Sequence, residues 1–70
     1  MSYQYHKYRV NNTISIDICD KFQYRICTFY KNKMDERWHI TTNGLTDYTE
    51  LRDAIDSHPV DKLEQILMTE

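Results

Sequence analysis

Five side chains of this chain could bind a metal ion: His6, His39, His58, Cys19 and Cys27. A zinc site needs about four nitrogen or sulfur ligands that converge on one point. None of the five lies at the short spacing of a paired metal motif, and the two cysteines match no secreted disulfide framework. We therefore expect no metal site, and we expect both cysteines to be free thiols.

Cys27 and His39 are the pair that could act as a nucleophile and a base. Such a pair needs a third group that orients the histidine, and Asp17 is expected two strands away. A phosphate-binding loop uses several glycines, and the chain has a single glycine, Gly44. The sequence therefore predicts a protein that is not an enzyme and that has no catalytic residue and no cofactor.

The secondary structure that positions the histidines and cysteines can be predicted from the hydrophobic pattern. This pattern is clearest at residues 13–18, where isoleucine takes every second position. Since successive side chains of a strand point to opposite faces, this run predicts a strand with one buried face and one wet face. Three further strands are predicted at residues 3–10, 22–30 and 37–42, and they are joined by turns and one polar loop.

After the fourth strand the hydrophobic period changes from two to about 3.6, which predicts two helices over 48–57 and 59–67. Asp47 and Glu50 form a capping-box pattern at the start of the first helix. Pro59 suits the first turn of the second helix, because its fixed φ is helical and it needs no hydrogen bond there.

Residues 1–70 are thus expected to form a single small α+β domain. The predicted fold is a four-stranded antiparallel β-meander followed by two short helices packed on one face, in the order ββββαα. The other face of the sheet is then left to solvent or to a partner.

The register predicts which side chains face away from the helices. Three-residue turns would place Ile16 between Tyr8 and Tyr24, so that the isoleucines meet apolar neighbours. In this register Tyr8, Tyr24, Tyr30 and Tyr48 fill the edge of the core. The residues predicted to bind a partner on the outer face are Tyr3, Tyr5, Lys7, Arg9, Arg25, Phe29, Arg37 and His39.

The charge is spread unevenly along the chain. Residues 1–46 carry seven basic and four acidic side chains, whereas residues 47–70 carry two basic and seven acidic ones. This asymmetry indicates that the two halves of the fold face different neighbours. No apolar run approaches the roughly 18 residues that span a bilayer, so we expect a cytoplasmic protein without membrane contact.

Tyrosine and arginine are enriched at protein interfaces because each combines contact area with hydrogen-bonding groups. Six tyrosines in 70 residues therefore favour a non-enzymatic protein-binding module, and a homodimer is one form it could take. In composition the chain resembles small phage- or mobile-element-encoded proteins that bind and block a host factor. On this hypothesis Tyr5→Ala or Phe29→Ala leaves folding intact and weakens partner capture.

Single-stranded nucleic acid is the alternative partner, because a sheet with exposed rings and arginines can stack bases. Two observations speak against it. The outward aromatic residues fall at opposite corners of the predicted sheet, and the chain is acidic, with a pI of about 5.8.

Overall fold

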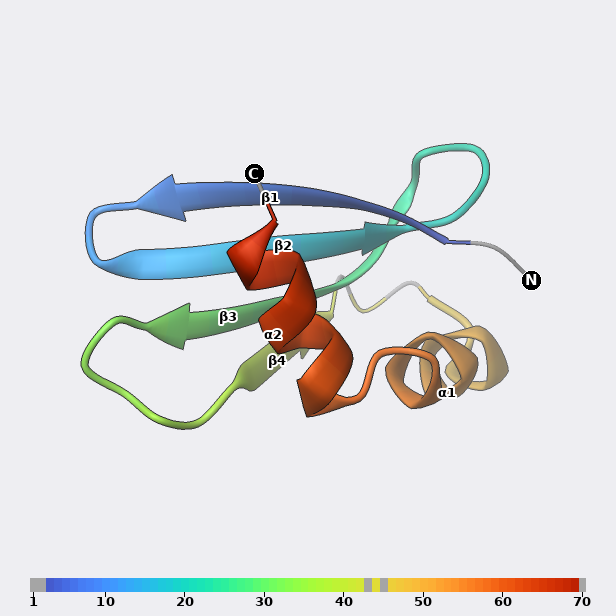
Figure 1. The fold of residues 1–70 in the computed structure, drawn as a ribbon. Helices are drawn as coiled ribbons and strands as arrows, with labels where there is room; N and C mark the ends of the chain where they lie inside the picture. Colours follow the sequence, from blue (N-terminus) through green and yellow to red (C-terminus); the bar gives the residue numbers. More distant parts are fainter. Residues whose placement is uncertain (1–2, 43, 45, 70) are drawn as a thin grey trace.

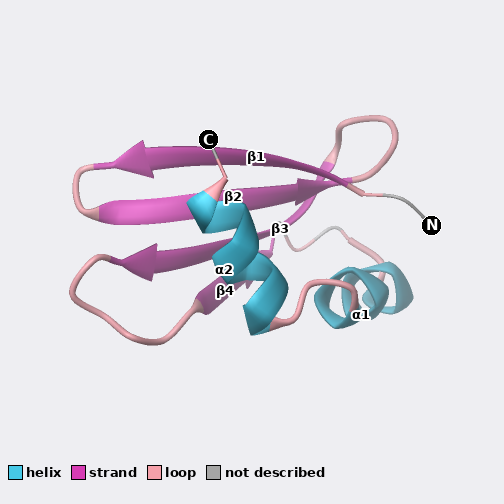
Figure 2. Ribbon diagram, in the orientation of Figure 1, coloured by secondary structure: helices cyan, strands magenta, loops and turns pink. Residues whose placement is uncertain are grey.

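The computed structural model describes residues 3–42, 44 and 46–69 of the chain and confirms the predicted α+β meander. The strands are β1 (Gln4–Val10), β2 (Thr13–Cys19), β3 (Arg25–Asn32) and β4 (His39–Thr42), and the helices are α1 (Tyr48–Asp56) and α2 (Val60–Met68). The strands form one antiparallel sheet in the order β1-β2-β3-β4 (Figures 1 and 2).

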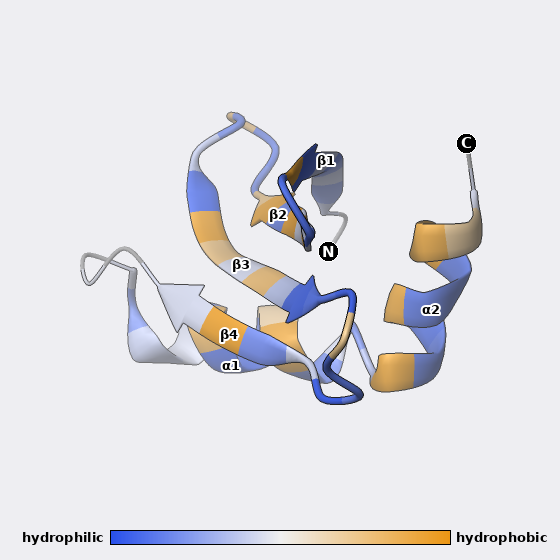
Figure 3. Ribbon diagram, turned by 90° about the vertical axis from the view of Figure 1, so that its left-hand side faces the viewer, coloured by the Kyte–Doolittle hydropathy of each residue, from blue (hydrophilic) through white to orange (hydrophobic). Residues whose placement is uncertain are grey.

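The core lies on the concave side of this sheet, where α2 crosses the strands (Figure 3). Ile16 and Ile18 are fully buried there, as the alternating isoleucines predict, and they pack with Leu63 and Ile66 of α2. Ala54 of α1 is also buried in this core, and α1 packs beside β3. We call this side the helix face. It carries the side chains of Tyr5, Lys7, Arg9, Ile14, Ile16, Ile18, Cys27, Phe29, Lys31, Ile40 and Thr42.

The turn between β1 and β2 has two residues rather than the predicted three. Val10 pairs with Thr13, and Asn11 takes a φ of 56°, the left-handed conformation that asparagine tolerates better than most residues. Tyr8 therefore pairs with Ser15, and not with Ile16 as predicted. Because a shift of one residue moves every side chain to the other face, β1 is turned over relative to the prediction.

The turn between β2 and β3 is a loop built around Asp20. Its carboxylate oxygen Oδ1 accepts hydrogen bonds from the backbone N–H groups of Phe22, at 2.8 Å, and Tyr24, at 3.0 Å. Its carbonyl oxygen accepts a third, at 2.9 Å, from Gln23, whose φ is 68°. These bonds form a loop where the sequence predicts strand, and β3 begins only at Arg25.

This longer loop also changes the pairing of the central strands. The predicted pairing of Ile16 with Tyr24 is wrong, because Ile16 pairs with Phe29 and the ring of Tyr24 is 72% exposed. An irregularity in the pairing where β3 begins lets two successive residues, Ile26 and Cys27, both reach the core.

A one-residue shift separates prediction and structure at β4 as well. Tyr30 pairs with His39 and not with Trp38. Trp38 lies just before β4 and packs against the core, while its Nε1 donates to the Glu64 carboxylate at 3.2 Å. Lys31 Nζ lies 3.6 Å from the same carboxylate and 5.8 Å from the centre of the indole ring. These contacts join the loop before β4 to α2.

The helix boundaries follow the prediction, but the capping contacts do not. Asp47 is the N-cap residue of α1, yet its side chain makes no capping hydrogen bond, so the capping-box interpretation is wrong. Pro59 is the N-cap of α2 rather than a residue of its first turn. His58 is buried between the two helices, and its Nδ1 lies 2.7 Å from the Ala54 carbonyl oxygen. This hydrogen bond satisfies the ring nitrogen at the buried junction between α1 and α2.

Phe29 and Phe22 form a matched pair that tests this register. Phe29 is 7% exposed and packs near the ring of His58, whereas Phe22 is 67% exposed. Phe29→Ala should therefore lower the free energy of unfolding by about 3–4 kcal/mol, because it leaves a cavity. The outward placement of Phe29 is wrong, and this predicted loss replaces the expectation that the variant leaves folding intact.

Phe22→Ala, as the control, should change the free energy of unfolding by less than about 0.5 kcal/mol. Urea denaturation followed by circular dichroism measures both variants. Equal stability of the two would place Phe29 outside the core and contradict the observed register.

Candidate functional site

The candidate site is the convex face of the sheet, opposite α2, and we call it the open face (Figure 3). Its outer strands β1 and β4 show exposed side chains, while the shorter side chains of β2 and β3 are covered by their longer neighbours. The open face carries Gln4, His6, Tyr8, Val10, Thr13, Ser15, Asp17, Cys19, Arg25, Thr28, Tyr30, Asn32, His39 and Thr41.

A hydrogen-bond network occupies the centre of the open face. Asp17 accepts from the Thr28 hydroxyl at 2.6 Å and from the Tyr8 hydroxyl at 3.1 Å. Arg25 Nη1 in turn donates to the Thr28 hydroxyl oxygen at 2.9 Å. Burial raises the pKa of the Tyr8 hydroxyl, and the charge of Asp17 raises it further. The network therefore satisfies one oxygen of the central carboxylate and holds the Tyr8 hydroxyl in place.

Beside this network one register row of the sheet holds three aromatic rings, from β1, β3 and β4, with Ser15 of β2 between the first two. Tyr8 pairs with Ser15, Ser15 with Tyr30, and Tyr30 with His39. The Tyr30 and His39 rings are stacked, with centroids 5.3 Å apart. His39 Nε2 lies 2.7 Å from the Asp35 carboxylate. This hydrogen bond lowers the pKa of Asp35, so the acid stays ionised and fixes the His39 ring.

Four of the residues predicted to bind a partner lie on the helix side of β1 instead. Tyr5, Lys7 and Arg9 pair with the three inward isoleucines of β2. Lys7 Nζ donates to the carbonyl oxygens of Ile66, at 3.2 Å, and Leu67, at 3.3 Å, and also to that of Thr69. Lys7 therefore satisfies carbonyl groups at the carboxyl end of α2, where a cation also suits the helix dipole.

Tyr3 is the fourth of these residues and connects the start of the chain to α1. Its hydroxyl donates a hydrogen bond to the Asp53 carboxylate, and its ring meets that of His58 edge-on, with centroids 5.7 Å apart. Tyr3 is half-buried and packs against the core. Its outward placement is therefore wrong, and its contacts indicate a structural role.

The remaining four predicted residues divide between the two sides of the sheet and a loop. Arg25 and His39 do lie on the open face. Phe29 is in the core. Arg37 precedes β4, and its backbone N–H donates to the Asp35 carboxylate at 3.0 Å. Of the eight residues predicted to bind a partner on the outer face, only Arg25 and His39 therefore lie on the open face.

Sequence reasoning missed Tyr8 and Tyr30, which it assigned to the core edge. Tyr8 is 43% exposed, and Tyr30 is half-buried within the row of rings. The signal that could have found Tyr8 is the Asn11-Asn12 pair, because a two-residue hairpin turn reverses which face Tyr8 occupies. The face of Tyr30 depends instead on the loop between β2 and β3. Tyr24 and Tyr48, also assigned to the core, are 72% and 70% exposed.

The candidate nucleophile and base are separated by the sheet. Cys27 is fully buried on the helix face, and His39 lies on the open face. Burial raises the pKa of Cys27 to about 11, and it also raises the pKa of Cys19. Both thiols therefore remain protonated near neutral pH, where they are poor nucleophiles. Within the described residues no group of three His, Cys, Asp or Glu side chains could hold a metal ion.

Comparison of this chain with protein-family models, with curated proteins and with solved structures gives no match. Function is therefore inferred from the geometry of the faces. Over the residues that the structure describes, neither helix is long and apolar enough to cross a membrane.

The contact of Tyr3 with α1 predicts a loss of stability at high pH. Burial raises the pKa of Tyr3 from 10.0 to about 12, and the hydrogen bond to Asp53 adds to this shift. The native state then keeps a proton that the unfolded chain loses, so the stabilisation is complete below pH 10 and declines toward pH 12.

Tyr3→Phe removes this titration. Chemical denaturation at a series of pH values should show wild type more stable than Tyr3→Phe at pH 8, and the difference should shrink as the pH approaches 12. A difference that stays constant across this range would show that the Tyr3 hydroxyl does not titrate with folding.

Proposed function

We propose that this protein is a non-enzymatic protein-binding module, of the inhibitor or adaptor type, that holds its partner on the open face. The observation that carries the proposal is the row of Tyr8, Tyr30 and His39 across the uncovered side of the sheet. Tyrosine supplies a large contact area at a low entropy cost, which is why it is frequent among interface residues that dominate binding.

The hydrogen bonds beneath these rings support the same function. An interface loses affinity when a buried charge has no partner. Asp17 Oδ1 already accepts from Tyr8 and Thr28, so a partner can cover this oxygen without leaving it unsatisfied. The stacked contact of Tyr30 with His39 also restricts both rings before binding, which lowers the entropy lost on association.

The charges of the open face favour a protein over a polyanion. A phosphate backbone is bound mainly by lysine and arginine. The permanent charges of the open face are one carboxylate, Asp17, and one guanidinium, Arg25, and the Arg25 Nη1 hydrogen bond to Thr28 ties this guanidinium into the network. Such a balance suits a mixed polar and aromatic protein surface.

Partner capture with matched variants tests the proposal. The tagged protein is incubated with a nuclease-treated lysate of its own host, and bound proteins are identified by mass spectrometry. Tyr8→Ala and His39→Ala should each reduce recovery of the wild-type partner by at least fivefold, because both remove rings from the open face. Tyr48→Ala is the control, since Tyr48 is 70% exposed on α1 and belongs to no strand.

Circular dichroism of each variant must first show an intact fold. A partner that is lost equally with Tyr48→Ala, or kept by both open-face variants, would contradict the proposal. A second copy of this chain is one possible protein partner, and light scattering at high micromolar concentration measures that association directly. Dimers that Tyr8→Ala dissociates would identify the open face as a homodimer contact.

Single-stranded nucleic acid is the second candidate, and the observed register favours it in one respect. The rings of Tyr8, Tyr30 and His39 lie in one row, rather than at opposite corners, and a row of rings is what base stacking uses. Fluorescence anisotropy with a labelled oligothymidine decides between the two functions. Salt-sensitive binding that Tyr8→Ala abolishes would support the nucleic-acid function, whereas no binding at low salt would exclude it.

A further inference from the structure

A second surface lies on the helix face, at the end of the sheet that α2 leaves uncovered (Figure 1). There a hollow of about 340 Å³ between β1 and α2 is lined by Lys7, Tyr8, Arg9, Ile14 and Leu67. A smaller hollow of about 170 Å³ shares Arg9 and Ile14 with it and adds Lys33 and the Asn11-Asn12 turn. We call the two together the basic hollow.

The cations of the basic hollow are not equivalent. Lys7 is bound to carbonyl oxygens at the end of α2. Arg9 and Lys33, in contrast, make no side-chain hydrogen bond or ion pair with any residue that the structure describes. Among the described residues, the hollow therefore offers two positive charges without an ion-pair partner, beside a third that binds carbonyl oxygens.

The backbone places the two residues at the border of the hollow. Arg9 lies within β1 and pairs with Ile14. The N–H of Lys33 donates to the Asn12 carbonyl oxygen at 2.7 Å, which connects the loop after β3 to the turn after β1. Arg9 and Lys33 thus border one depression through two elements that a hydrogen bond connects.

Part of the lining of the basic hollow is apolar. Ile14 and Leu67 are both half-buried, with part of each side chain facing the hollow. A ligand that fits must therefore carry negative charge next to aliphatic groups, because each kind of group then meets its complement.

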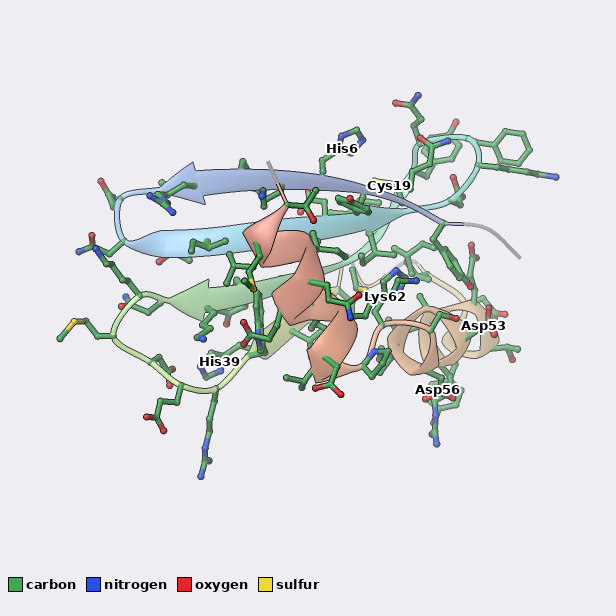
Figure 4. All side chains as sticks on the ribbon, in the orientation of Figure 1. His6, Cys19, His39, Asp53, Asp56 and Lys62 are labelled. Carbon is green, nitrogen blue, oxygen red and sulfur yellow. The ribbon has the colours of Figure 1, made fainter. Side chains whose placement is uncertain are left out.

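We propose that the basic hollow binds an acidic, aliphatic peptide segment of a partner protein. Its carboxylates lie against Arg9 and Lys33, and an aliphatic side chain lies on Ile14 and Leu67. A peptide fits better than a nucleic acid for two reasons. The two cations can pair with only a few anionic groups, and the aliphatic side chains of Ile14 and Leu67 make no favourable contact with a phosphate backbone. The acidic residues Asp53 and Asp56 of α1 lie at the far end of the molecule (Figure 4).

A titration followed by ¹⁵N nuclear magnetic resonance tests this proposal. The probe is a hexapeptide in which glutamate and leucine alternate, and the reference is the same peptide with glutamine in place of glutamate. The acidic peptide should shift the backbone signals of Arg9, Ile14, Lys33 and Leu67, and the binding should weaken as salt is added. The glutamine peptide should shift them at least fivefold less at equal concentration.

Variants then assign the charges. Arg9→Gln and Lys33→Gln should each weaken binding of the acidic peptide about threefold to fivefold, which is the range of an exposed ion pair. Lys62→Gln makes the same charge change at the other end of α2 and should leave the affinity unchanged (Figure 4).

Three results would overturn the proposal. The first is an absence of shifts at the basic hollow with the acidic peptide at millimolar concentration. The second is equal binding by the glutamine peptide or equal weakening by Lys62→Gln. The third is tighter binding of a ten-nucleotide oligothymidine at the same residues, which would assign the hollow to phosphate. Shifts confined to the open face would support the proposed function and contradict a peptide site on the helix face.

Discussion

The two-residue period of the β-strand is the constraint on which this structure depends. Each strand must bury one side, and a slip of one residue exchanges the buried side for the exposed one. In this sheet the turns decide the outcome, because they set how β1 and β3 pair with the alternating isoleucines of β2. Asn11 closes a two-residue turn in a left-handed conformation, and Asp20 organises a longer loop with its own carboxylate. Both turns rest on hydrogen bonds and backbone angles rather than on hydrophobic pattern.

A core of this size cannot afford unsatisfied polar groups, and the polar residues next to it are accordingly bonded. His58 sits between the helices against the Ala54 carbonyl oxygen, and Lys7 reaches the carbonyl oxygens at the end of α2. Thr28 and Asp17 satisfy one another on the other side of the sheet. In the described part of the chain no buried side-chain nitrogen or oxygen lacks a partner. Lys7 in particular shows that a basic side chain can be part of the fold rather than of a binding surface.

The sheet separates two surfaces of different chemistry. The open face presents aromatic rings around a carboxylate that is already hydrogen-bonded. The basic hollow presents aliphatic side chains beside cations that form no ion pair with a described residue. Residues of β1 contribute to both, because Tyr8 and Arg9 point to opposite sides of the same strand. The uneven charge along the sequence reappears as an acidic α1 at one end of the molecule and a basic hollow at the other.

The sequence by itself determined the element order, the antiparallel meander, the two helices and the burial of Ile16 and Ile18, because these follow from hydrophobic period and local turn residues. It also placed Arg25 and His39 on the open face. Only the tertiary structure decided that Phe29 is buried and that Tyr8 is exposed. The face of Tyr8 depends on a turn of two residues rather than three after β1, and the burial of Phe29 depends on the longer loop that Asp20 organises between β2 and β3. The hydrophobic pattern does not fix these loop lengths, because the side chains of both faces of the sheet must pack at once.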